Sequence, residues 1–311
     1  MKAIGFSQSG GPQVLHVFDR PEQHAGPGEV RIRVLAATVN PADTMARTGM
    51  SQQAMTALER PYVVGMEAAG TIDEVGEGVS LRVGEDVTAI VLPFGPRGGA
   101  YAEHVIVRAS HVFPTPKGMD SLAAATLPMN GLTAVMALDT LALSKGAIIA
   151  VTGAAGALGG YVVQLARAAG LQVIADASEA DEALVRGLGA HHVVRRGVDV
   201  AGRIRDLQPA GVAGLVDASV QNIEVTPAIA DGGTMVIVRA WSGDPGRGIR
   251  KEHVSVSQGA GRADLLAKLR QSIEKGVLTP RVARSYPAEE AAAAHRAMEA
   301  GGVRGRLVLT F

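Results

Sequence analysis

The chain has 311 residues, of which 47% are hydrophobic, and its 30 basic and 30 acidic residues give a formal net charge of zero. This length accommodates two domains of ordinary size. The balanced charge gives no excess of basic residues that would indicate binding to nucleic acid or to an anionic membrane. The chain contains no cysteine, which excludes disulfides, thiol nucleophiles and thiolate metal sites. The first residues lack the apolar run of a signal peptide, so we expect a cytoplasmic protein.

The first hundred residues predict β-structure joined by long loops. Residues Val30–Ala36 alternate between apolar and polar side chains, as a half-buried strand does. Further strands are expected over Ala68–Glu74, Asp86–Leu92 and Ala100–Val107, separated by turns rich in glycine.

From Ser121 onward, helices alternate with short apolar strands. The expected helices are Ser121–Leu127, Leu132–Leu141, Ala157–Ala169 and Asp181–Leu188, and the expected strands are Ala147–Val151, Gln172–Ala175, His192–Val194, Gly214–Asp217 and Thr234–Val238. This alternation predicts an α/β fold in which a doubly wound parallel sheet carries helices on both faces.

The end of the chain returns to the character of its beginning. A helix over Arg262–Lys275 is followed by a predicted strand at Arg281–Tyr286, an alanine-rich helix at Ala288–Ala300 and a closing strand at Arg306–Phe311. We therefore expect the chain to start in one domain, build a second and come back to the first.

The stretch Val151–Gly160 (VTGAAGALGG) follows a predicted strand directly and admits three interpretations. It lies within the uncharged window 146–166, which is long enough to span a membrane. Five glycines interrupt that window, however, and its periodicity changes from strand to helix, which disfavours a membrane span. A dinucleotide-binding turn and a tight turn that binds nothing remain.

The glycine spacing favours the dinucleotide-binding turn. Gly153, Gly156 and Gly159 are three residues apart, with Ala154 where the strict motif has glycine. In such a turn Gly156 would lie nearest the pyrophosphate, and Gly159 would let the following helix pack against the sheet. Ala157 and Leu158 begin that helix, whose N-terminal N–H groups would bind the anion.

Motifs along nearly the whole chain resemble the medium-chain dehydrogenase/reductase superfamily, and most of all its zinc-independent quinone oxidoreductase branch. They are Glu29–Val34, Val39–Asp43 (VNPAD), Pro61–Gly70 (PYVVGMEAAG), Ser80–Asp86, Tyr101–Val107, Leu127–Ala134 (LPMNGLTA), Val151–Gly160, Gln164–Gly170, Leu188–Ala190 and Gly305–Leu309. The resemblance implies a GroES-like β-barrel domain of residues 1–118 and 280–311, which holds the catalytic and substrate groups. It also implies a Rossmann NAD(P)-binding domain of residues 119–279, and a homodimer.

The resemblance also bears on metal binding. Relatives that use zinc have a histidine where this chain has Met66, and Glu67 alone cannot form a zinc site. His191 and His192 are adjacent on a predicted strand and would point to opposite faces, so they are not expected to bind one ion. Without zinc, the expected reaction is hydride transfer to an acceptor that is already polarised.

The resemblance assigns the catalytic positions to Asn40 and Asp43 of VNPAD. The Asn40 amide could stabilise negative charge that develops on a carbonyl oxygen, and Asp43 could orient it. The alternative is that both residues only form a turn. Candidate substrate-pocket residues are Met45, Met50, Met129 and Trp241, although methionines often simply fill a core.

The expected cofactor is NADPH, with NADH as the alternative. The residues that the resemblance places against it are Asn130, Thr133, Gly153, Gly156, Ala157, Leu158, Gly159, Ser178, Arg196, Val238 and Ala240. Asp176 invites an NADH interpretation, but Ser178 with Arg195 or Arg196 suits a 2′-phosphate better. Asn130, Thr133 and Ser178 could instead cap helices.

We therefore expect an NADPH-dependent oxidoreductase that delivers hydride to a quinone or an α,β-unsaturated carbonyl. Its partner would be a small-molecule substrate, with neither nucleic acid nor a membrane involved. An enoyl-thioester reductase of a biosynthetic pathway is the alternative enzyme, and a catalytically inactive nucleotide-binding protein is the alternative of another class.

Overall fold

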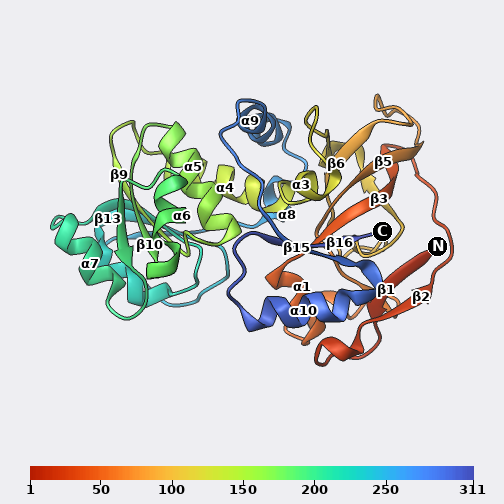
Figure 1. The fold of residues 1–311 in the computed structure, drawn as a ribbon, viewed down its shortest axis with the longest axis horizontal. Coiled ribbons are helices and arrows are strands. Elements are labelled where there is room, and N and C mark those ends of the chain that lie inside the picture. The colour runs from red at the N-terminus through yellow and green to blue at the C-terminus, as the bar shows by residue number, and fades with distance from the viewer. The chain divides into compact units, whose positions relative to one another are not determined.

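The computed structural model describes residues 1–311 except the side chain at position 52, and the chain forms two compact units (Figure 1). The terminal unit consists of Met1–Met129 and Pro280–Phe311, and the central unit of Asn130–Thr279. The sequence patterns place the first boundary near residue 118. The helix α3 (Ser121–Ala125) packs on strands of the terminal unit, however, and belongs with it.

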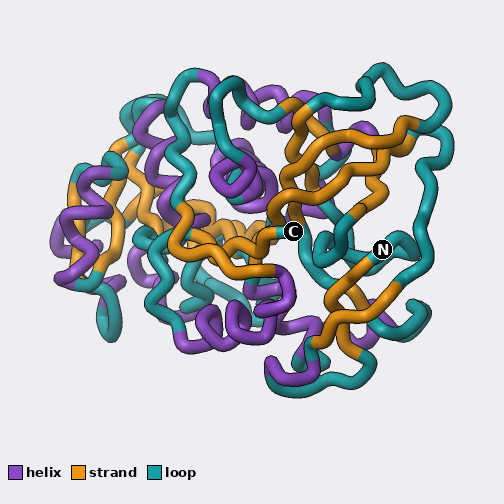
Figure 2. Tube along the Cα trace, turned by 45° about the vertical axis from the view of Figure 1, so that its right-hand side comes forward, coloured by secondary structure: helices purple, strands orange, loops and turns teal.

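Strands dominate the terminal unit (Figure 2). They are β1 (Lys2–Phe6), β2 (His16–Asp19), β3 (Glu29–Val39), β4 (Tyr62–Val63), β5 (Glu67–Val75), β6 (Asp86–Ile90), β7 (His104–Arg108), β8 (Val112–Pro114), β15 (Val282–Pro287) and β16 (Arg306–Thr310). The larger sheet has the order β15-β16-β3-β5-β6-β8, with β7 also paired to β3, and the smaller sheet has the order β2-β1-β4. The helices α1 (Pro41–Arg47), α2 (Gln52–Met55) and α10 (Ala291–Ala300) complete the unit with α3.

The register of the larger sheet brings distant parts of the chain together at one end of β3. There Val39 pairs with Leu307 of β16, and on the other side Ala37 pairs with Ala68 of β5. Because both pairs are antiparallel, the residues one step further along, Arg306 and Glu67, lie beside the point where β3 ends. The alternating burial of β3 fills the core with its apolar side chains.

The central unit has a single six-stranded parallel sheet with the order β11-β10-β9-β12-β13-β14. Its strands are β9 (Ile148–Thr152), β10 (Gln172–Ala177), β11 (His192–Arg195), β12 (Val212–Asp217), β13 (Ile229–Ile237) and β14 (Arg250–His253). Its helices are α4 (Pro128–Leu141), which begins at the boundary, α5 (Ala157–Ala168), α6 (Glu182–Gly187), α7 (Val200–Leu207), α8 (Val256–Gly259) and α9 (Ala263–Glu274). The predicted α/β class with a doubly wound parallel sheet is confirmed.

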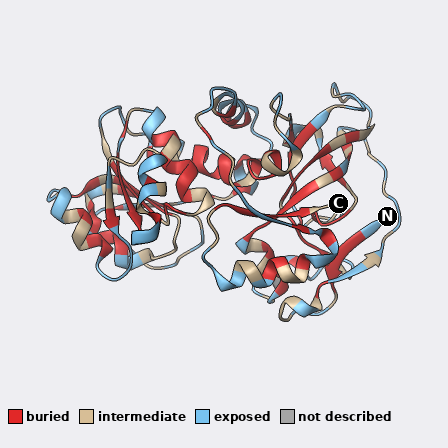
Figure 3. Cartoon of the chain, viewed as in Figure 1, coloured by how far each residue is buried: buried red, intermediate tan, exposed pale blue. Residues whose placement is uncertain are grey.

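The strand order of this sheet reverses at β9, which lies between β10 and β12. In open parallel sheets, ligands bind where the order reverses, at the carboxyl ends of the strands. The inner strands β10, β9 and β12 are mostly buried while the helices show exposed faces (Figure 3), and Thr152, the last residue of β9, is fully buried.

The uncharged window 146–166 folds as the strand β9, a turn and most of α5. In the described part of the chain, none of the helices has both the length and the apolar character needed to cross a bilayer.

Candidate functional site

The strand β3 ends at Val39, and the VNPAD motif turns the chain into α1. Asn40 is the N-cap residue in an extended conformation, which the following Pro41 favours. The Asp43 carboxylate accepts the Asn40 backbone N–H at 2.8 Å and the Gly65 backbone N–H at 2.9 Å. Asp43 therefore holds backbone on two segments, which agrees with its expected role as an orienting residue and with a helix-capping role.

The Asn40 side chain is fully buried and sits between a cation and an anion. Its Oδ1 accepts a hydrogen bond from Arg306 at 2.6 Å. Its Nδ2 lies 3.3 Å from Thr38 Oγ1 and 3.4 Å from Glu67 Oε1, so both of these contacts are longer than an ordinary N–H···O bond of about 2.9 Å. The carbonyl end of the amide is thus firmly held, and its donor end is held weakly.

Arg306 and Glu67 form a buried ion pair beside Asn40, with 2.5 Å between Nη2 and Oε1. Arg306 also donates to Thr38 Oγ1, and Glu67 Oε2 accepts the backbone N–H of Met129 at 2.8 Å. Among the described side-chain atoms, Arg306 Nε is one of two buried polar atoms without a hydrogen-bond partner. Two opposite charges therefore flank the amide in a buried environment.

Burial shifts the acid–base behaviour of Asp43. Desolvation raises the pKa of its carboxyl to about 6, against the lowering effects of the Asn40 and Gly65 N–H groups and of the Arg306 charge. The neighbouring Glu67 raises this pKa further. A carboxyl that titrates near neutrality in a polar cluster is a typical feature of a functional site.

The donor set beside Asn40 does not fit zinc. Met66 stands where a histidine ligand is expected, and Glu67 is already engaged by Arg306 and the Met129 N–H. Over the described residues, no group of three or more His, Asp or Glu side chains could hold a metal ion. His191 Nδ1 instead accepts the Val173 backbone N–H at 3.0 Å, while His192 is exposed.

The four predicted substrate-pocket residues differ in their surroundings. Met45 and Met129 are half-buried in the terminal unit, and Met50 is 66% exposed there. Trp241 belongs to the central unit, where it packs against a buried apolar cluster that includes Ile237 and Ile249. The Lys251 Nζ atom lies over the indole ring of Trp241, 5.0 Å from its centroid.

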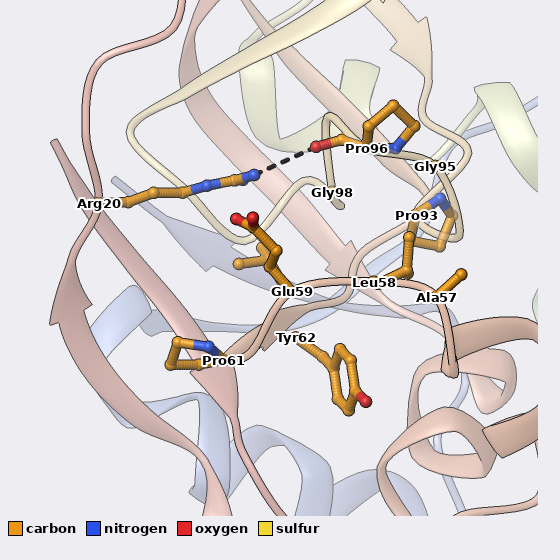
Figure 4. Close-up of a pocket in the computed structure, with 11 residues that line it drawn as sticks. Arg20, Ala57, Leu58, Glu59, Pro61, Tyr62, Pro93, Gly95, Pro96 and Gly98 are labelled. Carbon is orange, nitrogen blue, oxygen red and sulfur yellow. Dashed lines mark hydrogen bonds between the residues drawn. The ribbon is translucent and has the colours of Figure 1, made fainter.

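A cavity of about 350 Å³ in the terminal unit lies among other residues (Figure 4). It is lined by the Arg20 and Glu59 side chains, by Tyr62 and by the prolines at positions 61, 93 and 96. The Arg20 guanidinium donates to the carbonyl oxygens of Arg97 and Pro96, and burial lowers its pKa. None of the predicted site residues lines this cavity.

The glycine turn follows β9 in the central unit. Gly153 has a positive φ of 67°, and a Cβ at Gly159 would lie 2.3 Å from the Gly153 carbonyl oxygen. Gly156 is the N-cap of α5 in an extended conformation, and Ala157 and Leu158 begin the first turn. Backbone packed this closely before a helix N-terminus fits the pyrophosphate of a dinucleotide.

Asp176 supports this turn from β10 and is 4% exposed. Its Oδ1 accepts the Ala154 N–H at 3.2 Å, so this carboxylate is engaged by the glycine turn.

The residues predicted to contact the 2′-phosphate lie next to acidic side chains. Ser178 Oγ donates to the carboxylate of Asp181, and Arg195 pairs with Glu179 at 3.0 Å. Arg195 lies opposite Ala177 in the sheet, and the exposed Arg196 donates its backbone N–H to Ala177.

The remaining predicted cofactor residues lie on α4 and after β13. Asn130 and Thr133 are inside α4, which begins at Pro128, so the alternative that they cap the start of this helix is wrong. Val238 is half-buried and Ala240 is exposed just beyond β13.

Comparisons with known proteins agree with this architecture. Residues 26–117 match the alcohol dehydrogenase GroES-like domain, and residues 188–309 match the zinc-binding dehydrogenase family. The quinone oxidoreductase of Rattus norvegicus is 32% identical over 99% of this chain and 97% of its own. A 2-haloacrylate reductase of Burkholderia sp is 30% identical over 91% of each chain.

A solved mycobacterial structure in complex with NADPH has a TM-score of 0.88 and 30% identity, and it covers 100% of both chains. Together, the GroES-like domain and the parallel sheet with its glycine turn define a two-domain dehydrogenase/reductase class. The chain belongs to the medium-chain dehydrogenase/reductase superfamily, in its quinone oxidoreductase branch.

Proposed function

We propose that the chain is an NADPH-dependent oxidoreductase that delivers hydride to a quinone or an α,β-unsaturated carbonyl without a metal. Membership in the superfamily supports the general class, an NAD(P)-dependent oxidoreductase. The quinone oxidoreductase and 2-haloacrylate reductase relatives support a conjugated acceptor. The observation that carries the proposal is the weakly held amide donor of Asn40, whose oxygen is fixed by Arg306.

NADPH, when bound, supplies the hydride. The glycine turn and the N-terminus of α5 would hold its pyrophosphate, with Asn130 and Thr133 of α4 on the nicotinamide side. Neither a metal ligand nor a thiol is required from the chain for this chemistry.

Asn40 would stabilise the charge that develops on the acceptor's carbonyl oxygen. Because Arg306 polarises the amide through Oδ1, the Nδ2–H group becomes a stronger donor. The amide is fully buried, so the acceptor oxygen must displace the long contacts of Nδ2 to Thr38 and Glu67. The proton that completes the reduction would come from water.

The experiment is oxidation of NADPH with a quinone, an enone and an enoyl thioester. We expect turnover with the quinone or the enone, and a fall of about 100-fold in kcat for Asn40→Ala with unchanged NADPH affinity. Thr44→Ala on α1 is the matched control, because its hydroxyl donates to the Pro41 carbonyl oxygen within the same helix turn.

Two results would contradict the proposal. Turnover with the enoyl thioester alone would favour an enoyl-thioester reductase. NADPH binding without turnover on any acceptor would indicate a nucleotide-binding protein that has no reductase activity.

The preference for NADPH has a separate test at the end of β11. Arg195 is paired with Glu179 on the surface, and this pairing competes with a 2′-phosphate for the guanidinium. We expect Glu179→Gln to tighten NADPH binding by roughly two- to fivefold, the worth of an exposed ion pair, and to leave NADH binding unchanged. Glu182→Gln, which frees Arg186 instead, is the control. Tighter binding of NADH than of NADPH by the unaltered chain would refute the assignment.

A further inference from the structure

Four buried polar side chains of the terminal unit form a second cluster behind the Asn40 loop. They are Asp43 and Arg47 on α1, Tyr101 before β7, and His295 on α10, and each is at most 1% exposed. The helices α1 and α10 lie side by side in this unit (Figure 1), so the cluster fills the space between secondary-structure elements that are far apart in sequence.

The hydrogen bonds of this cluster run in one direction. Arg47 Nε lies 3.3 Å from His295 Nδ1 and can only donate, so Nδ1 accepts and the neutral imidazole carries its proton on Nε2. That Nε2–H group lies 3.2 Å from the Tyr101 hydroxyl oxygen, which leaves the Tyr101 proton for Asp43 Oδ2 at 3.3 Å. Donors therefore follow one another from the Arg47 guanidinium to the Asp43 carboxylate.

The charges around the cluster favour this order. Burial, together with the Arg47 charge, lowers the pKa of His295 to about 3, so the imidazole stays neutral at physiological pH. Burial also raises the pKa of Tyr101, which keeps its hydroxyl protonated as a donor. The Arg47 guanidinium is itself held by the Gly10 carbonyl and by Glu299 of α10.

The chain of hydrogen bonds ends on the atom that fixes the Asn40 backbone. Asp43 Oδ2 accepts both the Tyr101 hydroxyl and the Asn40 N–H, while Oδ1 accepts the Gly65 N–H. A donor at Oδ2 stabilises the ionised carboxylate, and the ionised form can accept all three hydrogen bonds. Loss of the Tyr101 hydroxyl would let Asp43 take up a proton more readily and rotate.

We infer that Tyr101 and His295 are positioning residues for the reduction, because they hold the Asp43 carboxylate in the orientation that fixes the Asn40 backbone. This inference rests on the proposed role of Asn40. Neither residue need touch substrate or cofactor. Their effect reaches the reaction through Asp43, whose charged neighbours are Arg306 on β16 and Glu67 on β5.

The test is Tyr101→Phe, which removes a single hydroxyl group from the buried cluster. We expect kcat to fall by roughly 10- to 100-fold, the order of effect of misplacing a reacting group by ~1 Å, with unchanged NADPH affinity. We also expect the Asp43 pKa, measured by carboxyl NMR, to rise. The acidic limb of the pH profile of kcat, where kcat falls as the pH is lowered, should move to higher pH with it. Tyr286→Phe is the matched control, because its hydroxyl accepts from Arg284 on the same strand, β15.

His295 provides a conservative variant. A glutamine at position 295 can still accept from Arg47 through its oxygen and donate to Tyr101 through its nitrogen, whereas leucine can do neither. We expect His295→Gln to retain most of the wild-type kcat, with the acidic limb of the pH profile at its wild-type position. His295→Leu should resemble Tyr101→Phe in kcat and in the position of the acidic limb.

A purely structural role would overturn the inference. It would appear as a wild-type kcat and acidic limb in Tyr101→Phe, or as a lower kcat that follows a lower melting temperature with the Asp43 pKa unchanged. Asn40→Ala in the same assays separates the two proposals. Loss of turnover in Asn40→Ala with wild-type turnover in Tyr101→Phe overturns only the positioning role, whereas wild-type turnover in Asn40→Ala overturns the role of Asn40 and the positioning role with it.

Discussion

At the scale of single residues, the candidate site is built from polar and charged side chains that are buried in the terminal unit. Asn40 and Asp43 stand where the motif VNPAD places them, but most of their partners come from elsewhere in the chain. Arg306, Glu67 and Tyr101 are 266, 27 and 58 residues away from the groups they contact. Residues with such separations belong to one site only because the sheet register and the helix packing bring them together.

The folded chain should lose stability as Asp43 ionises. Burial, the largest cause, raises the pKa of this carboxyl from 3.8 to about 6. The folded state therefore binds the proton more tightly than the unfolded state, so the contribution of Asp43 is most favourable below pH 3.8 and is lost as the pH rises to about 6. Over this interval, the Asp43 titration should lower the free energy of unfolding by roughly 3 kcal/mol. We expect this decrease to be absent in Asp43→Asn, as measured by urea unfolding at a series of pH values.

His295 acts in the opposite direction and must be separated from Asp43. Its pKa is about 3 in the folded chain and 6.5 in the unfolded chain, so its contribution is lost as the pH falls from 6.5 towards 3. The same titration in a His295→Gln background removes that slope. An unfolding free energy for Asp43→Asn that differs from wild type by a constant amount at every pH would contradict the raised pKa.

At the scale of elements, the turn between β9 and α5 shows what a motif in the sequence can specify. Its strand, glycines and helix are all local, so the stretch Val151–Gly160 was enough to predict the turn. The support that Asp176 gives to the Ala154 N–H was not predictable, because it joins β10 to a turn 22 residues away. The start of α4 at Pro128 was also missed, since the apolar run of LPMNGLTA does not mark where its helix begins.

Gly159→Ala should disrupt this element. The added Cβ would lie 2.3 Å from the Gly153 carbonyl oxygen, so either α5 or the turn must shift. We expect the unfolding free energy to fall by about 1–3 kcal/mol and NADPH binding to weaken, as measured by urea unfolding and by nucleotide titration. Gly187→Ala is the control, because a Cβ there meets no atom within 4 Å. Equal stability and nucleotide affinity in the two variants would refute the close approach.

At the scale of the whole molecule, the order of elements along the chain was predictable, and so was its return to the first unit. Hydrophobic periodicity predicted the parallel sheet, because buried parallel strands read as short apolar runs between helices. The edge strand β14 was not predicted, since its sequence RKEH lacks such a run. The short strands β1, β2, β4 and β8 were not predicted either, although β1 contains a short buried apolar run. The boundary of the terminal unit depends on the packing of α3 against β3 and β5. That packing is a tertiary contact, so the sequence pattern did not predict it.

The ion pair between Glu67 and Arg306 ties the last strand to the first half of the chain. Breaking a buried pair leaves a charge without its partner, so we expect Glu67→Gln to cost about 3–5 kcal/mol of unfolding free energy. A Glu67→Met/Arg306→Met double variant should recover most of this loss, as measured by urea unfolding.

The exposed pair Glu182–Arg186 provides the comparison for this measurement. Glu182→Gln should change the unfolding free energy by less than about 1 kcal/mol. A Glu67→Gln variant as stable as Glu182→Gln would show that the buried pair contributes no more than a surface pair.

The position of Arg306 near the end of the chain also affects the order of synthesis. The ribosome makes Thr38, Asn40 and Glu67 long before it makes Arg306, and residues 130–279 of the central unit lie between them in the message. Until translation passes residue 306, the Glu67 carboxylate has no guanidinium to neutralise it, and β3 lacks its neighbour β16. A polypeptide released before that codon would lack both β16 and the guanidinium that holds the Asn40 Oδ1 atom.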